Sequence, residues 1–385
     1  MLLRIENTPR PYAWGSTTAI AELLGTTPSG GPEAELWLGD HPGSPARIVA
    51  GDAGGASDLS SMLLARGEKL PFLLKVLAAG EPLSLQAHPT IAQAREGFAR
   101  ENAAGLALDD PARNYKDELH KPELIFALSD PFIALAGFRS LAEARAELAT
   151  VDEPCVIDFV NRLSGDDALP DTIAWLLEGG EEVTHLVLAL ADEAGDSHPH
   201  DPHGTWATVR RLAEYYPGDP GIAMSTLMHT VVLRPGEALY LPTGNIHSYQ
   251  QGLAIEVMAA SDNVLRGGLT PKHVDAAELM RVLDARPVAE PRIVPVEVLP
   301  NVHRFTPDVV DFALTVVEAG SAVDGITLET GGPAIVLCLD GRATLQGSLV
   351  LERGQAAYCD DDEVSIHGDG RVVIATGDHP DTVES

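Results

Sequence analysis

The sequence has few cysteines, few basic residues and no long apolar run, and each shortage excludes a class of protein. Its three cysteines, Cys155, Cys338 and Cys359, lie far apart and form no CxxC pair. This pattern argues against a disulfide framework and predicts reduced core thiols in a cytoplasmic protein. No apolar run approaches the roughly 20 residues that span a bilayer, and the N-terminus turns polar after three residues. We therefore expect neither a membrane helix nor a signal peptide.

The shortage of basic residues has the clearest consequence for partners. The chain has 26 Lys and Arg against 57 Asp and Glu, which gives a formal net charge of −31. Such a surface repels phosphate backbones and anionic lipids, so we expect no nucleic-acid or membrane partner. By contrast, a chain of 385 residues that is 45% hydrophobic is long enough for two or three folded domains. Its 36 glycines and 28 prolines favour short strands joined by turns.

Strand and helix patterns alternate along the chain. Residues 70–77 form a buried-strand candidate in which Lys75 is a lone charge that needs a partner or a ligand. Apolar residues recur at helical spacing between residues 140 and 217, where Ser140 can cap the first helix. From Met228 the pattern returns to short strands and turns.

These patterns predict a mainly β fold with a helical insert. The segment YYPGDPG, residues 215–221, ends the insert, and a later helix is expected to begin with Thr270 as its cap and Pro271 in its first turn. The predicted domains are a discontinuous catalytic domain over residues 1–139 and 218–284, a helical insert over residues 140–217, and a C-terminal β domain over residues 285–385.

Residues 233–249 carry the first fragment with chemical character. The phrase LRPGEALYLPTGNIHSY resembles the second metal-binding motif of cupins, in which a histidine after a turn points into a small jelly-roll barrel. Here that histidine is His247. The walls of a small barrel are rigid enough to hold a ligand in place. A surface turn with an incidental histidine is the alternative interpretation.

Two further fragments contain residue types that bind metals. In SLQAHP, Gln86 and His88 are two apart, so on a strand both side chains face the same side. An amide oxygen and an imidazole nitrogen are acceptable ligands for a divalent metal. Glu123 stands where the polar phrase NYKDELHKPE meets the apolar phrase LIFAL. A carboxylate at the entrance of a core needs a metal or a cation.

The fourth fragment, residues 254–272, is rich in charges. Glu256 interrupts an apolar strand, and Asp262, Arg266 and Lys272 follow in a glycine-containing loop. Charged groups beside buried strands and a helix start suit a phosphorylated, polyhydroxylated ligand.

Taken together, the fragments resemble the type I phosphomannose isomerases. Matching phrases occur in the same order from residue 10 to residue 272: RPYAWGS, ELWLGDHPGSPA, PFLLKVL, SLQAHP, HKPELIFAL, GNIHSY and IEVMAASDNVLRGGLTPK. The resemblance implies a zinc-dependent, cupin-type aldose–ketose isomerase that interconverts mannose 6-phosphate and fructose 6-phosphate through a cis-enediol. The C-terminal domain shows a cupin-like strand pattern of its own but lacks a ligand triad, so we interpret it as structural.

The same resemblance assigns site residues. One Zn²⁺ per chain would be bound by Gln86, His88, Glu123 and His247, a set that leaves an open position for substrate or water. The predicted catalytic residues are Arg266, Lys272, Glu256, Asp262 and Lys121, and the predicted substrate- or phosphate-binding residues are Ser84, Lys75 and Trp14. The catalytic base is left open between Glu256 and Asp262, and Trp14 suits a core position equally well.

Two other functions fit parts of this pattern. A cupin oxygenase would favour an iron site with three histidines, whereas this set has two. A non-catalytic sugar-binding cupin would not need the complete ligand set together with Arg266 and Lys272. The histidine-rich phrase HPHDPH, residues 198–203, is interpreted as a solvated loop. The expected partner is a small sugar phosphate, and the composition is compatible with a monomer.

Overall fold

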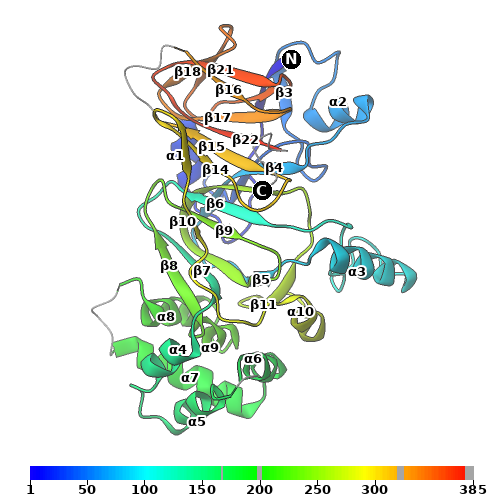
Figure 1. Cartoon of the computed structure of the whole chain (residues 1–385). Coiled ribbons are helices and arrows are strands. Elements are labelled where there is room, and N and C mark those ends of the chain that lie inside the picture. Colours follow the sequence, from blue (N-terminus) through cyan, green and yellow to red (C-terminus); the bar gives the residue numbers. More distant parts are fainter. Residues whose placement is uncertain (166–167, 197–201, 319–324, 378–385) are drawn as a thin grey trace, which may run out of the picture.

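The computed structural model describes residues 1–165, 168–196, 202–318 and 325–377. Figure 1 shows two β units stacked one above the other, with a group of helices below the lower unit, at the end far from the N-terminus. The fold is mainly β, as the sequence predicts. No helix in the described ranges combines the length and apolar character needed to cross a bilayer.

The central unit is a ten-stranded sheet organised around strand β10 (His247–Ala259). This long strand pairs with β4, β5, β6 and β7, so residues far apart in sequence meet along it. The buried strand predicted around Lys75 is confirmed, because every residue of β4 is buried. The other strands of this sheet are β2 (Glu35–Leu38), β4 (Phe72–Ala79), β5 (Leu85–Ala87), β6 (Glu123–Ala127), β7 (Phe132–Phe138), β8 (Met228–Leu233), β9 (Ala238–Leu241), β11 (Leu265–Gly268) and β12 (Arg292–Ile293).

The second β unit contains both ends of the described chain. Its eight-stranded sheet has the order β13-β14-β15-β22-β17-β20-β1-β3, and its four-stranded sheet has the order β16-β21-β18-β19. Strand β1 pairs with β20, with Leu2 opposite Cys359, so N-terminal and C-terminal segments share one sheet. The strands are β1 (Leu2–Glu6), β3 (Arg47–Ala50), β13 (Val296–Leu299), β14 (Val302–Phe305), β15 (Ala313–Val317), β16 (Ile326–Glu329), β17 (Ala334–Asp340), β18 (Arg342–Leu345), β19 (Leu349–Glu352), β20 (Ala356–Cys359), β21 (Glu363–Gly368) and β22 (Arg371–Thr376).

The helical insert packs against one end of the central unit (Figure 1). Ser140 caps its first helix by accepting a hydrogen bond from the Glu143 amide, as predicted. The apolar core of the insert is continuous with Leu85 and Ala87 of β5 and Leu265 of β11. The helices of the insert are α4 (Leu141–Leu148), α5 (Pro154–Arg162), α6 (Ala168–Glu178), α7 (Glu181–Asp196) and α8 (Thr205–Tyr215), and the short helix α9 (Gly221–Ser225), which follows the insert, packs on the same core.

One predicted helix start is wrong. The helix expected from Thr270 begins instead as α10 (Ala276–Val282), with Asp275 as its cap, because the Asp275 carboxylate accepts a hydrogen bond from the Glu278 amide. The Thr270 hydroxyl accepts a hydrogen bond from the Lys272 amide at 3.1 Å, which favours a local turn over a helix. The remaining helices are α1 (Ala19–Leu24), α2 (Leu59–Arg66) and α3 (Ile91–Ala103).

Candidate active site

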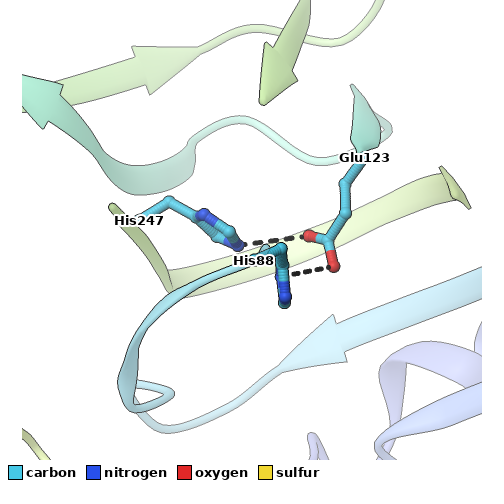
Figure 2. A group of neighbouring side chains, drawn as sticks. All are labelled: His88, Glu123 and His247. Atoms are coloured by element: carbon cyan, nitrogen blue, oxygen red, sulfur yellow. Dashed lines mark ion pairs between the residues drawn. The ribbon is translucent and has the colours of Figure 1, made fainter. Parts of the chain in front are cut away.

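Three predicted metal ligands meet at the ends of three strands. His88 directly follows β5, Glu123 is the first residue of β6, and His247 is the first residue of β10. Figure 2 shows the two imidazoles facing the carboxylate between them. The Nε2 atom of His88 lies 3.1 Å from one Glu123 oxygen, and the Nε2 atom of His247 lies 3.2 Å from the other. All three side chains are buried, and their ligand atoms lie within 4.8 Å of one another.

Neighbouring groups fix the orientation of these ligands. His88 donates from Nδ1 to the Asn263 carbonyl at 2.7 Å, and His247 donates from Nδ1 to the Asn245 carbonyl at 3.2 Å. Both Nε2 lone pairs therefore point toward Glu123, the arrangement typical of histidines that bind metals. The Nε2 atom of His88 is buried without a hydrogen-bond partner. Such an atom is costly unless it binds something, and a metal ion would satisfy it.

Gln86, the fourth predicted ligand, lies beside this group. Gln86 on β5 is paired with His247 on β10, and the nitrogen of its side-chain amide is 3.4 Å from the His247 Nε2 atom. The four side chains together offer two nitrogens and two oxygens, a set that suits a four-coordinate metal with room for one more ligand. The residues present therefore fit a zinc ion.

The charges of the group also suit a metal. Burial alone would raise the pKa of Glu123, but the ammonium of Lys121, 2.8 Å away, and the two imidazoles outweigh burial and hold this pKa well below its usual range. Burial, with the charge of Lys121 adding to it, lowers the pKa of His88 to about 4. At neutral pH the group therefore presents an anionic carboxylate and a neutral imidazole, the forms that coordinate metals.

Lys75 finds two carboxylate partners. Its ammonium lies 2.9 Å from Glu256 and 3.5 Å from Glu35, and Glu35 also accepts a hydrogen bond from the Trp37 indole at 2.8 Å. Burial would lower the pKa of Lys75, but the two carboxylates outweigh it and raise this pKa, so the lysine stays charged. Burial raises the pKa of Glu256 against the attraction of Lys75. The strand-borne charge noted in the sequence is thus part of a buried ionic group.

A cavity of ≈510 Å³ connects these groups. Its wall includes all eight residues predicted as catalytic or substrate-binding, together with the two predicted ligands Gln86 and Glu123. Those eight are Trp14, Lys75, Ser84, Lys121, Glu256, Asp262, Arg266 and Lys272.

The cavity holds two basic side chains that lack an ion-pair partner within the described part of the chain. Burial lowers the pKa of Arg266, and burial together with the charge of Arg266 lowers the pKa of Lys272. In a protein of net charge −31, two such cations side by side are exceptional. An anion placed between them would restore the stabilisation that they lack.

Several residues that line the cavity or contact its lining were not predicted as site residues. His41 pairs with Asp262 at 3.2 Å, and the Tyr249 hydroxyl donates to Glu123 at 2.9 Å. Tyr249 carried a usable signal, because it is two residues after His247 and so shares its face of the strand. The signal for Glu35 was weaker. A buried Lys75 requires a carboxylate partner, but the sequence does not show which carboxylate lies beside it. No local pattern pointed to Tyr216, which also lines the cavity.

The histidine-rich phrase gives a prediction with a small effect. His198 and His200 lie outside the described residues, and among the described ones a single group of three metal-compatible side chains was found, His88 with Glu123 and His247. Replacing His198, His200 and His203 together with alanine should leave metal content and turnover within about twofold of wild type, because the sequence predicts a solvated loop there and none of the three is a proposed ligand. Elemental analysis and an activity assay check this, and loss of zinc would contradict the loop interpretation.

Comparisons with known proteins agree on one family. Residues 2–141 match the family described as "Phosphomannose isomerase type I, catalytic domain". The chain is 39% identical over 390 residues to the mannose-6-phosphate isomerase of Escherichia coli (strain K12), covering 96% of this chain and 98% of that protein. It is 30% identical over 402 residues to the rat (Rattus norvegicus) mannose-6-phosphate isomerase, covering 90% of each. A zinc-bound crystal structure of mannose 6-phosphate isomerase superposes with a TM-score of 0.88 at 36% identity, covering 98% of this chain and 100% of that one.

Proposed function

From the premise that the chain belongs to the type I phosphomannose isomerases, we propose a reaction path for the isomerisation of mannose 6-phosphate in this cavity. The chain is a zinc-dependent aldose–ketose isomerase that interconverts mannose 6-phosphate and fructose 6-phosphate. The observation that carries the proposed path is the layout of the cavity. Glu123 of the buried metal-compatible group lines it, together with Arg266 and Lys272, two cations without an ion-pair partner among the described residues.

The metal-binding residues of the proposal are His88, Glu123 and His247, with Gln86 as a fourth ligand. When bound there, zinc would supply Lewis acidity to a substrate oxygen at the reacting carbons. The protein residues keep the site ready for this role. The backbone carbonyls of Asn263 and Asn245 orient the imidazoles of His88 and His247. The Tyr249 hydroxyl orients the carboxylate of Glu123.

The phosphate-binding residues of the proposal are Arg266 and Lys272, with Ser84 on the same cavity wall. A guanidinium presents a fork of N–H donors that matches phosphate oxygens, and an ammonium adds a point charge. Both cations are partly desolvated, which strengthens their interaction with a dianion. Trp14, which stacks on Tyr12 with ring centroids 5.9 Å apart, offers an aromatic face to the sugar in between.

Proton transfer is the remaining step. The reaction moves a proton between C2 and C1 through a cis-enediol, and a carboxylate base is most effective when its pKa is raised toward neutral. Glu256 has a raised pKa, whereas the pKa of Asp262 is lowered: burial would raise it, but the hydrogen bond and charge of His41 and the charges of Lys121 and Lys75 together outweigh burial. We therefore assign the base to Glu256. Lys75 and Lys121 supply positive charge for the developing enediolate.

The finer fold and location also belong to the proposal. We assign the central sheet to a cupin-type catalytic domain drawn mainly from residues 1–139 and 218–284, from which β1 and β3 join the sheet of a cupin-like C-terminal domain. Support comes from the proposed ligands at strand ends, since rigid secondary structure holds a metal site more precisely than loops do. The free cysteines Cys155, Cys338 and Cys359 support a cytoplasmic location.

A coupled assay tests the proposed function. Purified protein given mannose 6-phosphate should form fructose 6-phosphate, while mannose without the phosphate should react far more slowly because Arg266 and Lys272 would have no anion to bind. Elemental analysis should find zinc. Oxygen consumption with bound iron would instead indicate the cupin oxygenase, and sugar-phosphate binding without turnover would indicate a non-catalytic protein.

A further inference from the structure

The segment that leaves the helical insert, residues 216–221, lies against two walls of the cavity. From the sequence, this segment is identified only as the end of the insert. In the structure, Tyr216 contacts the segment of residues 80–84 on one side. Asp219 and Gly221 contact residues 268–270 on the other side. We call residues 216–221 the exit segment.

The first wall is held through its backbone carbonyls. The Tyr216 hydroxyl donates to the Pro82 carbonyl at 2.6 Å, and the Arg211 guanidinium donates to the Gly80 carbonyl at 2.8 Å. This short stretch leads directly to Ser84 on the cavity wall. Burial raises the pKa of Tyr216, and nearby carboxylates add to the effect, so the phenol keeps the proton that it donates.

The second wall is held by Asp219. One of its oxygens accepts from the Gly221 amide at 2.7 Å, and the other accepts from the Thr270 amide at 3.4 Å. The packing here is close: a Cβ atom on Gly268, whose φ is +126°, would lie 2.8 Å from the Asp219 carboxylate. The Thr270 hydroxyl in turn accepts from the Lys272 amide at 3.1 Å. The exit segment is therefore two hydrogen bonds away from the backbone of Lys272.

We propose that Tyr216 and Asp219 are positioning residues for the substrate phosphate. Neither needs to touch the substrate: together they set the spacing between the wall that carries Ser84 and the wall that carries Arg266 and Lys272. This inference rests on the proposed function, because it assumes that the two walls bind phosphate. A phosphate site needs its donors within a fraction of an ångström of the right place, so loosening either wall weakens binding.

The geometry predicts a specific kinetic signature. Neither residue is a metal ligand or the proposed base, so their loss should change binding and leave the chemical step intact. A rise in KM with unchanged kcat indicates that the lost interaction stabilised the bound substrate and the transition state equally. A merely structural role would instead lower stability or zinc content and reduce kcat by inactivating part of the sample.

Tyr216→Phe is the first test, with Tyr215→Phe as its matched control. The phenylalanine keeps the ring but removes the hydrogen bond to Pro82, and Tyr215 is an adjacent tyrosine that is 39% exposed. We expect about a fivefold rise in the KM for mannose 6-phosphate, which corresponds to one neutral hydrogen bond. The Kd of inorganic phosphate, measured by calorimetry, should rise in parallel, while kcat stays within about twofold and zinc content is unchanged. Tyr215→Phe should match wild type in all four quantities.

Asp219 gives the second test. Asp219→Ala removes both acceptors and should raise KM and the phosphate Kd by about tenfold or more. Asp219→Asn keeps one carbonyl acceptor and should recover part of the loss. An unchanged phosphate Kd in both Tyr216→Phe and Asp219→Ala would overturn the positioning role, as would a fall in kcat at unchanged KM. The phosphate Kd does not depend on turnover, so a wild-type protein that binds phosphate without isomerising the sugar would contradict the proposed function alone.

Discussion

Replacing His247 with alanine should remove most of the bound zinc and nearly all turnover. The imidazole of His247 is one of the two proposed nitrogen ligands, and its loss leaves Glu123 with a single histidine partner. Loss of an outer-sphere partner alone costs about 10–100-fold in metal affinity or activity, so loss of a ligand should exceed that range. Elemental analysis of the dialysed variant and the coupled isomerase assay measure the two effects.

A histidine outside the site serves as the control for this variant. His185 is exposed on helix α7, and His185→Ala should keep both zinc and turnover. Thermal unfolding of both variants separates metal loss from misfolding. If His247→Ala retained full zinc and full activity, the metal site would have been placed on the wrong residues.

Replacing Arg266 with lysine should lower kcat by roughly 10²-fold or more, an effect comparable to losing one oriented donor in a preorganised site. The substitution keeps the charge but removes the guanidinium fork that matches phosphate or enediolate oxygens. Arg266 is half-buried in the cavity, and in the described part of the chain it makes no ion pair that could explain its presence as structural. Steady-state kinetics with mannose 6-phosphate measure the loss.

Zinc content and melting temperature should stay near wild type in Arg266→Lys, because Arg266 is not a metal ligand. The matched control is Arg95→Lys on helix α3, where the arginine is exposed. This variant should keep the kcat of wild type, because even an exposed ion pair contributes only about 0–1 kcal/mol. Unchanged kcat in Arg266→Lys would remove this residue from the reacting centre. A large drop in melting temperature would instead assign it a structural role.

Local sequence context singles out Glu123 of the metal-compatible group, because its charge conflicts with apolar neighbours, whereas the complete ligand set follows from the family resemblance. A carboxylate at the start of an apolar strand, as at Glu123, is costly unless it has a partner, so its position alone signals function. The same reasoning identified Lys75 as a charge in need of a partner. It could not identify Glu35, because the partner is set by strand pairing across β2 and β4, where Trp37 lies opposite Lys75. Pairing of this kind joins residues 38 positions apart and leaves no local pattern.

The helix start at Thr270 shows a different limit. Threonine followed by proline is a good local signal for a helix N-terminus, but Asp275 offers a stronger cap five residues later. The Thr270 amide also has a tertiary partner in Asp219, which no local pattern reveals. Tyr216 was missed for the same reason, since its hydrogen bond reaches Pro82 across 134 positions. The proposed positioning residues act through contacts between residues far apart in sequence, which flanking residues do not reveal. The proposed ligand Glu123, by contrast, stands out from the apolar residues that follow it.

The pairing of β1 with β20 bears on how the chain matures during synthesis. One edge of β1 pairs with the nearby β3, whereas the other pairs with residues Ala356–Cys359 of β20, and Leu2 lies 357 positions before its partner Cys359. Apolar residues of β1, such as Leu3 and Ile5, belong to the same core as Phe72 of β4 and Tyr358 of β20. Forming a contact across so long a loop is slow, and an unpaired strand edge is prone to aggregate in the interval. The edge of β1 that faces β20 is therefore protected only after residues 356–359 have been made.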